Sequence, residues 1–377
     1  MRPVAATRVA IVGAGFTGAV IARTLADAGI ASVVMDERRH VAGNCHTERD
    51  ARTGIMLHLY GPHIFHTDLP HVWSYIQRFG EMMPFVLRVK SMVRGQVYSL
   101  PINLHTINQF FGRAMAPAEA MAFLAAQARD DIEEPRSFED YALRHLGAPL
   151  YEAFFRGYTR KQWGIDPGAL PAAILRRLPI RFNYDDNYFA HRWQAIPRDG
   201  YGAIVARMLD HPKIEVRLGC RFEDAASEAF AHLFYSGSVD RYYRYDIGRL
   251  TYRTLDFERS YHAGDYQGTA LMNHPDEDIA HTRVTEHRHF APWEQPPTNE
   301  TVVFHEFSRD CGPNDIPFYP VDLAAGARLL ATYRERAANE RGVTFVGRLG
   351  RFAYLDMDRA IDQAMTAAAE YLRGLGR

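Results

Sequence analysis

The sequence is poor in cysteine. Its 377 residues include only Cys45, Cys220 and Cys311. These lie far apart and form no CxxC pair, so they suggest neither a disulfide framework nor a zinc site. The sequence also lacks an excess of charge of either sign, because its 44 Lys and Arg residues nearly balance its 45 Asp and Glu residues. This balance argues against non-specific binding to nucleic acid or to an anionic membrane.

Long apolar runs are also missing. No stretch approaches the length needed to cross a bilayer, and Met1–Arg8 lacks the apolar core of a secretory signal. The chain is long enough for two or three domains with a large core. We therefore expect a reduced, soluble, cytoplasmic protein with no membrane or nucleic-acid partner.

A glycine-rich loop follows the first apolar run of the chain. Val9–Val12 is typical of a parallel strand buried on both faces, and it leads into Gly13-Ala14-Gly15-Phe16-Thr17-Gly18. Gly13 permits a tight turn, Gly15 lets the backbone approach a pyrophosphate, and Gly18 lets the next helix pack on the strand. A helix over roughly residues 16–28 would present its N-terminal amides to phosphate groups.

An acidic residue ends the second predicted strand. Ser32–Met35 leads to Asp36, which lies 18 residues past Gly18, where a carboxylate can accept a ribose hydroxyl. Strand, helix, strand and acid together predict a dinucleotide site. The structural alternative is a plain βαβ unit with a glycine-rich turn. A basic stretch and then Gly43-Asn44 follow the acid, as in FAD-binding and amine-oxidase-like proteins, which favours FAD over NAD.

The rest of the chain predicts an α/β fold in which a FAD-binding Rossmann-like domain carries an inserted helical domain and an antiparallel β-sheet domain. Residues 85–93 and 97–100 are typical of a β-hairpin, and Ser137 with Asp140 resembles a capping box. We expect a discontinuous FAD-binding domain (residues 1–80, 201–240 and 321–377), a helical insert with a mobile lid (105–177) and an antiparallel sheet domain (81–104, 178–200 and 241–320).

Ten short blocks follow in order along the chain: Gly13–Gly18, Gly43-Asn44, Tyr60–Thr67, Ser99–Leu104, Gly157–Trp163, Asp186–Phe189, Gly248–Leu250, Thr282–His287, Phe318–Pro320 and Gly347–Asp358. Together they resemble the bacterial, flavin-dependent UDP-galactopyranose mutases over nearly the whole length. The order of the blocks is specific for that family and less specific for the sugar.

The resemblance implies an isomerase that uses FAD without net redox change. In that family the reduced flavin N5 attacks the anomeric carbon of UDP-galactopyranose and expels UDP. The covalent adduct opens as an iminium, and the ring recloses before UDP returns. The implied partners are a UDP-sugar substrate and a reductant such as NAD(P)H. The resemblance is compatible with a homodimer, which the sequence itself does not specify.

The catalytic residues implied by the resemblance are Arg177, Arg283 and His66. Both arginines match those that clasp the diphosphate, a task for which a guanidinium is suited. Read alone, each arginine is more typical of a surface ion pair. His66 would position the flavin, with His63 on the same segment. No third or fourth ligand stands at a useful spacing, so we expect no metal site there, and a buried structural histidine remains the alternative for His63.

The resemblance also implies two binding sets. The first holds substrate, with an aromatic wall for the uridine and a tryptophan near the sugar, and consists of Phe154, Phe155, Tyr158, Thr159, Trp163, Tyr188, Asn273, Tyr319 and Tyr354. The second holds the cofactor and consists of Gly13, Gly15, Phe16, Gly18, Asp36, Gly43, Asn44, His63, Arg348, Asp356 and Met357. For the tyrosines, the structural alternative is a half-buried place in the core.

Three positions depart from the family pattern as we expect it. Leu87 stands where an asparagine is expected, Ala42 replaces a glycine, and Phe352 replaces a tyrosine. Leu87 could change the preferred sugar, so UDP-N-acetylgalactosamine, UDP-arabinopyranose and a deoxy-sugar nucleotide stay open as substrates. An amine-oxidase-like flavin oxidoreductase and a catalytically silent nucleotide-sugar-binding protein are the alternatives from other classes.

Overall fold

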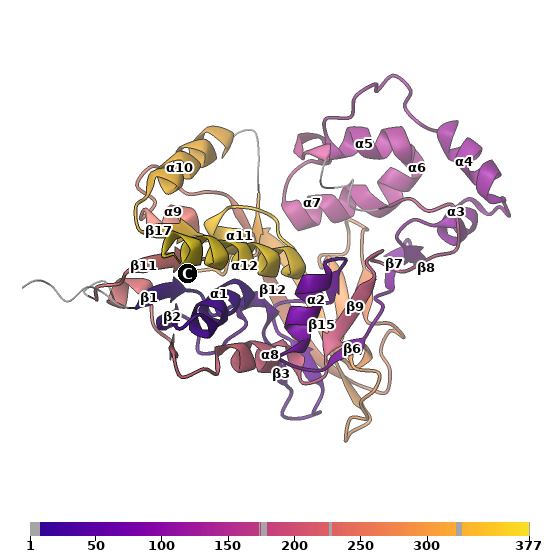
Figure 1. Ribbon diagram of the computed structural model, residues 1–377. Coiled ribbons are helices and arrows are strands. Elements are labelled where there is room, and N and C mark those ends of the chain that lie inside the picture. Colours follow the sequence, from indigo (N-terminus) through magenta and orange to yellow (C-terminus); the bar gives the residue numbers. More distant parts are fainter. Residues whose placement is uncertain (1–7, 173, 175–178, 226–227, 322–325, 377) are drawn as a thin grey trace, which may run out of the picture.

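The computed structural model describes residues 8–172, 174, 179–225, 228–321 and 326–376. A parallel sheet with flanking helices and a larger, mainly antiparallel sheet form its body, and a helical unit stands beside them (Figure 1). The α/β class predicted from the sequence is confirmed. Among the described residues, no helix is long and apolar enough to cross a membrane.

The parallel sheet has five strands in the order β10-β2-β1-β11-β17. Their bounds are β1 (Val9–Val12), β2 (Ser32–Asp36), β10 (Ile214–Leu218), β11 (His232–Tyr235) and β17 (Val343–Phe345). β2 pairs with one edge of β1, and β11, which comes much later in the chain, pairs with the other edge of β1. Ligands of open α/β sheets bind beyond the carboxyl ends of the strands where the order reverses in this way.

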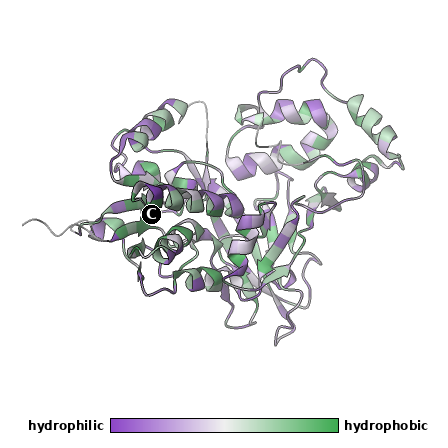
Figure 2. Ribbon diagram, viewed as in Figure 1, coloured by the Kyte–Doolittle hydropathy of each residue, from purple (hydrophilic) through white to green (hydrophobic). Residues whose placement is uncertain are grey.

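Alternate residues of β1 face different helical layers. Val9 and Ile11 join a core with α1 (Phe16–Asp27), α8 (Gly200–Leu209) and α12 (Met357–Gly374), while Ala10 joins a second core. This alternation follows from the two-residue period of a strand and makes β1 buried on both sides. Single helices such as α12 carry both hydrophobic and hydrophilic residues (Figure 2), as expected for helices that cover a sheet.

The glycine loop turns sharply between β1 and α1. Gly13 has φ of +101°, and a Cβ at Gly13 would lie 2.1 Å from the Ser236 hydroxyl oxygen. A Cβ at Gly18 would lie 1.9 Å from the carbonyl oxygen of Gly13. The predicted packing of helix on strand at Gly18 is therefore confirmed.

The second large sheet has the order β16-β12-β15-β14-β13-β7-β8. Its strands are β7 (Val89–Val93), β8 (Gln96–Leu100), β12 (Tyr252–Ala263), β13 (Leu271–Asn273), β14 (Arg283–Glu286), β15 (Glu300–Asp310) and β16 (Tyr319–Pro320). Only the β7–β13 pair is parallel among these described strands. Smaller sheets join β5 (Phe65–Thr67), β9 (Trp193–Pro197) and β6 (Met82–Pro84), and also β3 (Thr47–Arg49) and β4 (Met56–His58).

The predicted hairpin is confirmed, but its first strand was placed too early. β7 begins at Val89 rather than at residue 85, because Met82–Pro84 pairs with β9 and the chain must leave that sheet first. Leu87 lies in this passage, where its carbonyl oxygen accepts a hydrogen bond from the Tyr188 amide at 2.8 Å.

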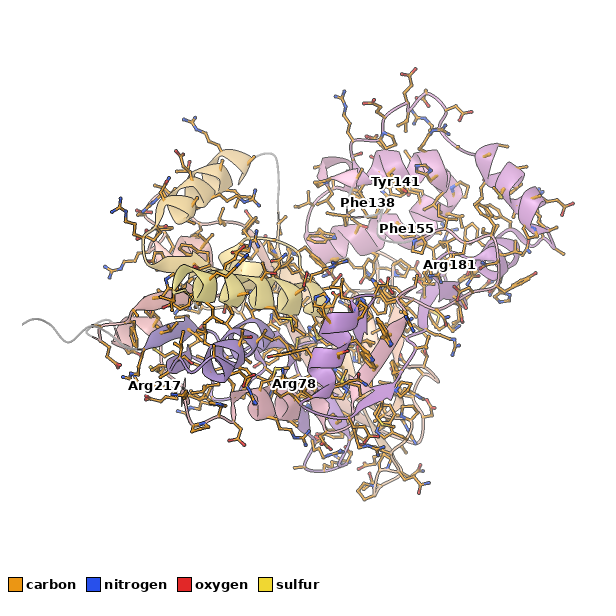
Figure 3. All side chains as sticks on the ribbon, viewed as in Figure 1. Arg78, Phe138, Tyr141, Phe155, Arg181 and Arg217 are labelled. Atoms are coloured by element: carbon orange, nitrogen blue, oxygen red, sulfur yellow. The ribbon has the colours of Figure 1, made fainter. Side chains whose placement is uncertain are left out.

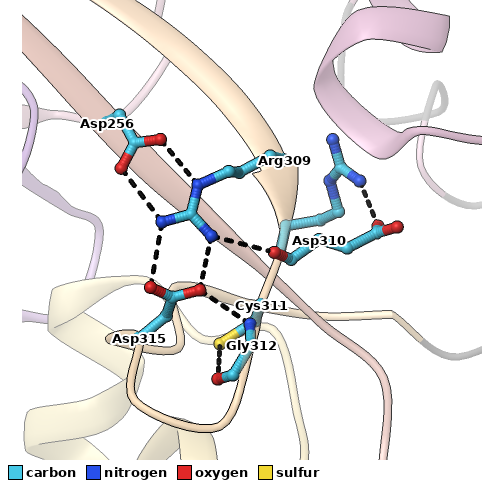
Figure 4. Close-up of polar contacts among 7 residues, drawn as sticks. Asp256, Arg309, Asp310, Cys311, Gly312 and Asp315 are labelled. Atoms are coloured by element: carbon cyan, nitrogen blue, oxygen red, sulfur yellow. Dashed lines mark hydrogen bonds and ion pairs between the residues drawn. The ribbon is translucent and has the colours of Figure 1, made fainter.

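Ion pairs close the end of the β12–β15 ribbon (Figure 4). Arg309 donates to both oxygens of Asp256, at 2.7 and 3.2 Å, and to Asp315. The neighbouring Asp310 pairs with Arg253, whose side chain is 4% exposed. The ribbon end therefore holds a buried guanidinium in a fixed place.

The helical unit contains α3 (Leu104–Phe111), α4 (Pro117–Ala125), α5 (Phe138–His145), α6 (Ala148–Leu150), a π-helical turn (Tyr151–Arg156) and α7 (Gly157–Trp163). Ser137 and Asp140 form the predicted capping box, with both hydrogen bonds at 3.0 Å. The remaining helices are α2 (Pro70–Gln77), α9 (Val239–Tyr242), α10 (Ala327–Asn339) and α11 (Gly347–Gly350), and 3₁₀ turns cover Gly43–Cys45, Pro167–Ala169, Phe222–Ala225 and His287–Phe290.

Gly18→Ala tests the contact between helix and strand. The added methyl meets backbone rather than a flexible side chain, so the variant should be destabilised by about 1–3 kcal/mol or more. Gly374→Ala, at the open end of α12, is the matched control and should change stability by less than about 1 kcal/mol. Thermal and urea melts of both variants measure the effect, and equal stability of the two would contradict the packing described.

Candidate active site

Three adjoining cavities run from the parallel sheet to the helical unit. The first, the glycine-loop cavity, lies at the carboxyl ends of β1 and β2. Its lining includes many of the predicted cofactor residues: Gly13, Gly15, Phe16, Asp36, Gly43, Asn44, His63, Arg348 and Met357. Gly18 lies beneath the loop, where it packs against Gly13.

The glycine-loop cavity fits a dinucleotide. Gly15 and Gly43 approach so closely that a Cβ on Gly43 would lie 3.5 Å from the Gly15 Cα. Asp36 accepts hydrogen bonds from the amides of Ala14 (2.8 Å) and Arg38 (2.9 Å), which fix its carboxylate beside the loop. Each oxygen retains a lone pair for a ribose hydroxyl. The N-terminus of α1 supplies amide donors and a positive dipole end for phosphate groups.

Arg38 lines this cavity too, although the sequence predictions did not include it. It donates to Asn44 Oδ1 at 2.7 Å, and its guanidinium lies 4.8 Å from the centre of the Tyr60 ring. Its Nη1 is buried and has no hydrogen-bond partner among the described residues. A charged donor is thus left for an anionic ligand, and the basic stretch after Asp36 was the signal for it.

The tyrosine cavity adjoins the first one and shares His63, Arg348 and Met357 with it. It brings together predicted residues from distant parts of the chain: His66, Tyr158, Tyr188, Asn273, Arg283, Tyr319, Tyr354 and Asp356. Its lining also includes four aliphatic side chains, those of Ile64, Leu87, Val89 and Leu271. Asp356, which the resemblance assigns to the cofactor, lies on this side, next to the shared residue Met357.

The apolar cavity continues beyond the tyrosine cavity and shares Tyr158, Tyr188 and Asn273 with it. Phe154 and Phe155 line it with Leu100, Pro101, Ile102, Tyr141, Leu146, Pro179 and Ile180. Figure 3 shows Tyr141 and Phe155 within the helical unit, with Arg181 below them. Asn273 Oδ1 is buried without a partner among the described residues, so it can accept from an N–H group of a flat ligand.

Arg283 is the cation of the tyrosine cavity. Its Nε donates to Glu306 Oε1 at 2.8 Å, and the side chains are only 18% and 1% exposed. Burial opposes the charge of Arg283, but Glu306 and then Tyr158 and Tyr319 raise its pKa well above the usual value. The guanidinium is therefore charged at any physiological pH. Glu306 was not among the predicted residues, because the pairing of β14 with β15 is what brings it to Arg283.

The tyrosines around Arg283 keep their protons. Burial raises the pKa of Tyr319 to about 12 and raises the pKa of Tyr158 and Tyr188 as well. The rings of Tyr319 and Tyr354 stack at 5.8 Å, and the Arg348 guanidinium lies 4.9 Å from the Tyr354 ring centre. At neutral pH the cavity thus presents phenol donors and a guanidinium, which suits a phosphate ligand.

The two histidines of the predicted flavin segment have different partners. His63 Nδ1 contacts the Gly61 carbonyl oxygen at 2.8 Å, and burial lowers the pKa of His63 to about 4, so the ring is neutral. His66 Nδ1 lies 3.1 Å from His191 Nδ1, and its ring stacks on Phe189 at 3.7 Å. The sequence predictions did not include His191.

Two of the predicted substrate residues line none of these three cavities in the part of the chain that the structure describes. Thr159 is buried inside α7, and Trp163 lies outside the linings with its ring centre 6.2 Å from that of Tyr319. Arg177 lies outside the described residues. Among the residues that are described, the one group of three possible metal ligands is Asp265, Glu286 and His289, which lines none of the three cavities.

Sequence comparisons match most of this chain. A family profile described as UDP-galactopyranose mutase matches residues 153–354, and one described as an NAD(P)-binding Rossmann-like domain matches residues 11–79. A probable UDP-galactopyranose mutase of Klebsiella pneumoniae is 52% identical over 362 residues, covering 96% of this chain and 94% of that protein. A dTDP-fucopyranose mutase of Escherichia coli is 48% identical over 373 residues, covering 97% and 98%.

The fold has a solved counterpart. The crystal structure of a reduced UDP-galactopyranose mutase superposes with a TM-score of 0.76 at 17% identity, covering 99% of this chain and 95% of that one. At that identity the likeness shows the fold alone. The profile spans more than half of the chain, and both relatives are aligned over nearly all of it. This chain therefore belongs to the UDP-galactopyranose mutase family of isomerases.

Proposed function

We propose that the protein is a FAD-dependent mutase that interconverts UDP-galactopyranose and UDP-galactofuranose. The observation that carries this proposal is the order of the three cavities, each of which shares three residues with the next. A dinucleotide in the glycine-loop cavity, a sugar in the tyrosine cavity and a base in the apolar cavity would lie in sequence. The proposal includes a cytoplasmic location, a reductant such as NAD(P)H and assembly as a homodimer.

The nucleotide end of the substrate would occupy the apolar cavity. Phe154, Phe155 and Tyr158 offer flat apolar surface to uracil. Asn273 Oδ1 would accept the uracil N–H, for which it has a free lone pair. Arg181, with its side chain 10% exposed and paired with Asp185 at 3.2 Å, steadies the segment that carries Tyr188.

The diphosphate would bind between the base and the sugar. Arg283 supplies charge there, and Tyr158, Tyr188 and Tyr319 supply protonated hydroxyl donors. Such donors stabilise a leaving UDP because charge grows on its phosphate oxygens as the sugar bond breaks. Arg177, from the resemblance, would be a second cation at this place.

The glycine loop, Asp36, Gly43 and Arg38 would hold the FAD. When bound and reduced, the flavin supplies a nucleophilic ring nitrogen to the anomeric carbon. Met357 begins the 18-residue helix α12 beside this cavity, so its N-terminal amides favour negative charge on a ligand there. Ile64, Leu87 and Val89 would limit the access of water to the sugar.

A reduction-dependent assay tests the proposed function. The purified protein, loaded with FAD, is incubated with UDP-galactopyranose or UDP-galactofuranose with and without dithionite, and the products are separated by chromatography. We expect interconversion only in the reduced sample, with the flavin still reduced afterwards. Bleaching of oxidised flavin by substrate alone would indicate an oxidoreductase, and binding of UDP-sugar without any product would indicate a silent binder.

Arg283→Ala tests the diphosphate contact. A charged hydrogen bond contributes roughly 1.5–3 kcal/mol, so turnover should fall by at least about 10- to 100-fold while flavin content is retained. Arg129→Ala is the control, because Arg129 is exposed and pairs with Asp131, two residues away on the surface. Normal turnover of UDP-galactose by Arg283→Ala would show that its assignment is wrong.

A deoxy-sugar nucleotide is the second candidate substrate. Leu87 is 3% exposed and lines the tyrosine cavity beside other aliphatic residues, so this part of the wall cannot donate to a sugar hydroxyl. A sugar that carries a methyl group in place of a hydroxymethyl group would lose no hydrogen bond to this part of the wall. The relative from E. coli that is 48% identical is named as a mutase of such a nucleotide sugar.

Leu87→Asn distinguishes the two substrates. If Leu87 faces the sugar, the ratio of kcat/KM values should shift toward UDP-galactose and away from a deoxy-sugar nucleotide, by less than roughly tenfold, because a neutral hydrogen bond contributes about 0.5–1.5 kcal/mol. Leu124→Asn is the control for burial, since Leu124 is 2% exposed in α4 and lines none of the cavities. A destabilised Leu87→Asn with an unchanged ratio would place Leu87 in the core instead.

A further inference from the structure

The side chain of Lys161 is enclosed by backbone carbonyl groups. Lys161 lies on α7, and its Nζ donates to the carbonyl oxygens of a single loop, the segment 274–282 that joins β13 to β14. The distances are 2.6 Å to His274, 2.8 Å to Asp276, 2.8 Å to Ile279 and 3.1 Å to His281. One ammonium group thus defines the path of the whole loop.

These contacts use the full donor capacity of Lys161. An ammonium group has three protons, and here four carbonyl oxygens share them. No donor is left for a phosphate, so Lys161 is not a diphosphate ligand. Because the acceptors are main-chain atoms, they hold the position of the loop backbone rather than the rotamer of a side chain.

The two elements that Lys161 joins carry different parts of the proposed nucleotide site. α7 carries Tyr158, whereas the strands on either side of the loop carry Asn273 and Arg283. The two elements also touch directly, since a Cβ on Gly157 would lie 2.2 Å from the Pro275 carbonyl oxygen. The distance between these two halves of the site therefore depends on this contact.

The carboxyl end of α7, which includes Lys161, is fixed through its backbone to the same sheet. Arg253 on β12 donates to the carbonyl oxygens of Gln162 at 3.1 Å and Lys161 at 3.2 Å, and the Ser308 hydroxyl on β15 also donates to Gln162 at 2.7 Å. With this end held, a change at Lys161 would alter the separation of α7 from the loop rather than release the helix.

We propose that Lys161 is a positioning residue, which sets the separation between Tyr158 on α7 and the pair Asn273 and Arg283 on the β13–β14 hairpin. This inference rests on the nucleotide site proposed above. Misplacement of binding groups by about 1 Å can reduce activity by about 100-fold, so the effect should appear in nucleotide affinity as well as in turnover.

The test compares Lys161→Met with Arg160→Ala. Methionine keeps the length and removes every donor. Arg160 joins the same helix to the same loop through Glu277 at 3.3 Å, but as an exposed pair, which contributes little. UDP titrations of the FAD-loaded proteins should give a Kd raised about 10- to 100-fold for Lys161→Met and within about threefold of the wild type for Arg160→Ala. Flavin content should be equal in all three.

The outcomes separate this inference from the proposed function. Failure of the wild-type protein to bind UDP would refute the nucleotide site itself. Tight binding by the wild type with an unchanged Kd for Lys161→Met, whatever its melting temperature, would show a merely structural role for Lys161.

A measurement on the wild type keeps the inference testable if Lys161→Met does not fold. Hydrogen exchange of the FAD-loaded protein is followed with and without UDP. If Lys161 couples the position of α7 to that of the loop, UDP should slow exchange in residues 157–163 and 274–282 together. Protection of α7 alone, with exchange in the loop unchanged, would overturn it.

Discussion

The candidate site depends on one buried ion pair, that of Arg283 with Glu306. The two residues stand opposite each other in the register of β14 and β15. A guanidinium that is withdrawn from water is costly unless a carboxylate compensates it, and removal of either partner would leave a buried charge. A shift of this register by one residue would place the two side chains on opposite faces of the sheet, so the ion pair forms only in the register observed.

The position of this charge explains why the site combines two sheets. The parallel sheet supplies the glycine loop and the N-terminus of α1, which suit a dinucleotide. The antiparallel sheet supplies the fixed cation, and the helical unit supplies aromatic surface for a base. His63, Arg348 and Met357 belong to the cavities on both sides of the junction, so a cofactor and a sugar would meet there.

Features that arise from neighbouring residues could be predicted from the sequence. The strand, glycine loop and helix from Val9 to Asp27 are determined by local backbone sterics and by hydrophobic period, and so is the Ser137–Asp140 capping box. The family blocks placed Arg283 and the tyrosines in one site. The proposed roles of Arg177, Thr159 and Trp163 rest on the resemblance alone.

Features that arise from contacts between distant segments could not be predicted. Glu306 reaches Arg283 through strand pairing. Lys161 contacts main-chain carbonyl oxygens, which every residue has, so the residue types of the loop could not indicate these contacts. The start of β7 was misplaced because apolar residues 85–87 pass between two sheets, where burial gives the same pattern as a strand. Arg38 was overlooked because a basic residue after a strand is usually solvated.

The most direct test of the account is a crystal structure of the reduced, FAD-loaded protein with UDP-galactopyranose. The account predicts uracil against Phe155 and Asn273, the diphosphate at Arg283, and the anomeric carbon directed toward the flavin beside His63 and Met357. A nucleotide bound outside the apolar and tyrosine cavities, or a sugar directed away from the flavin, would contradict it.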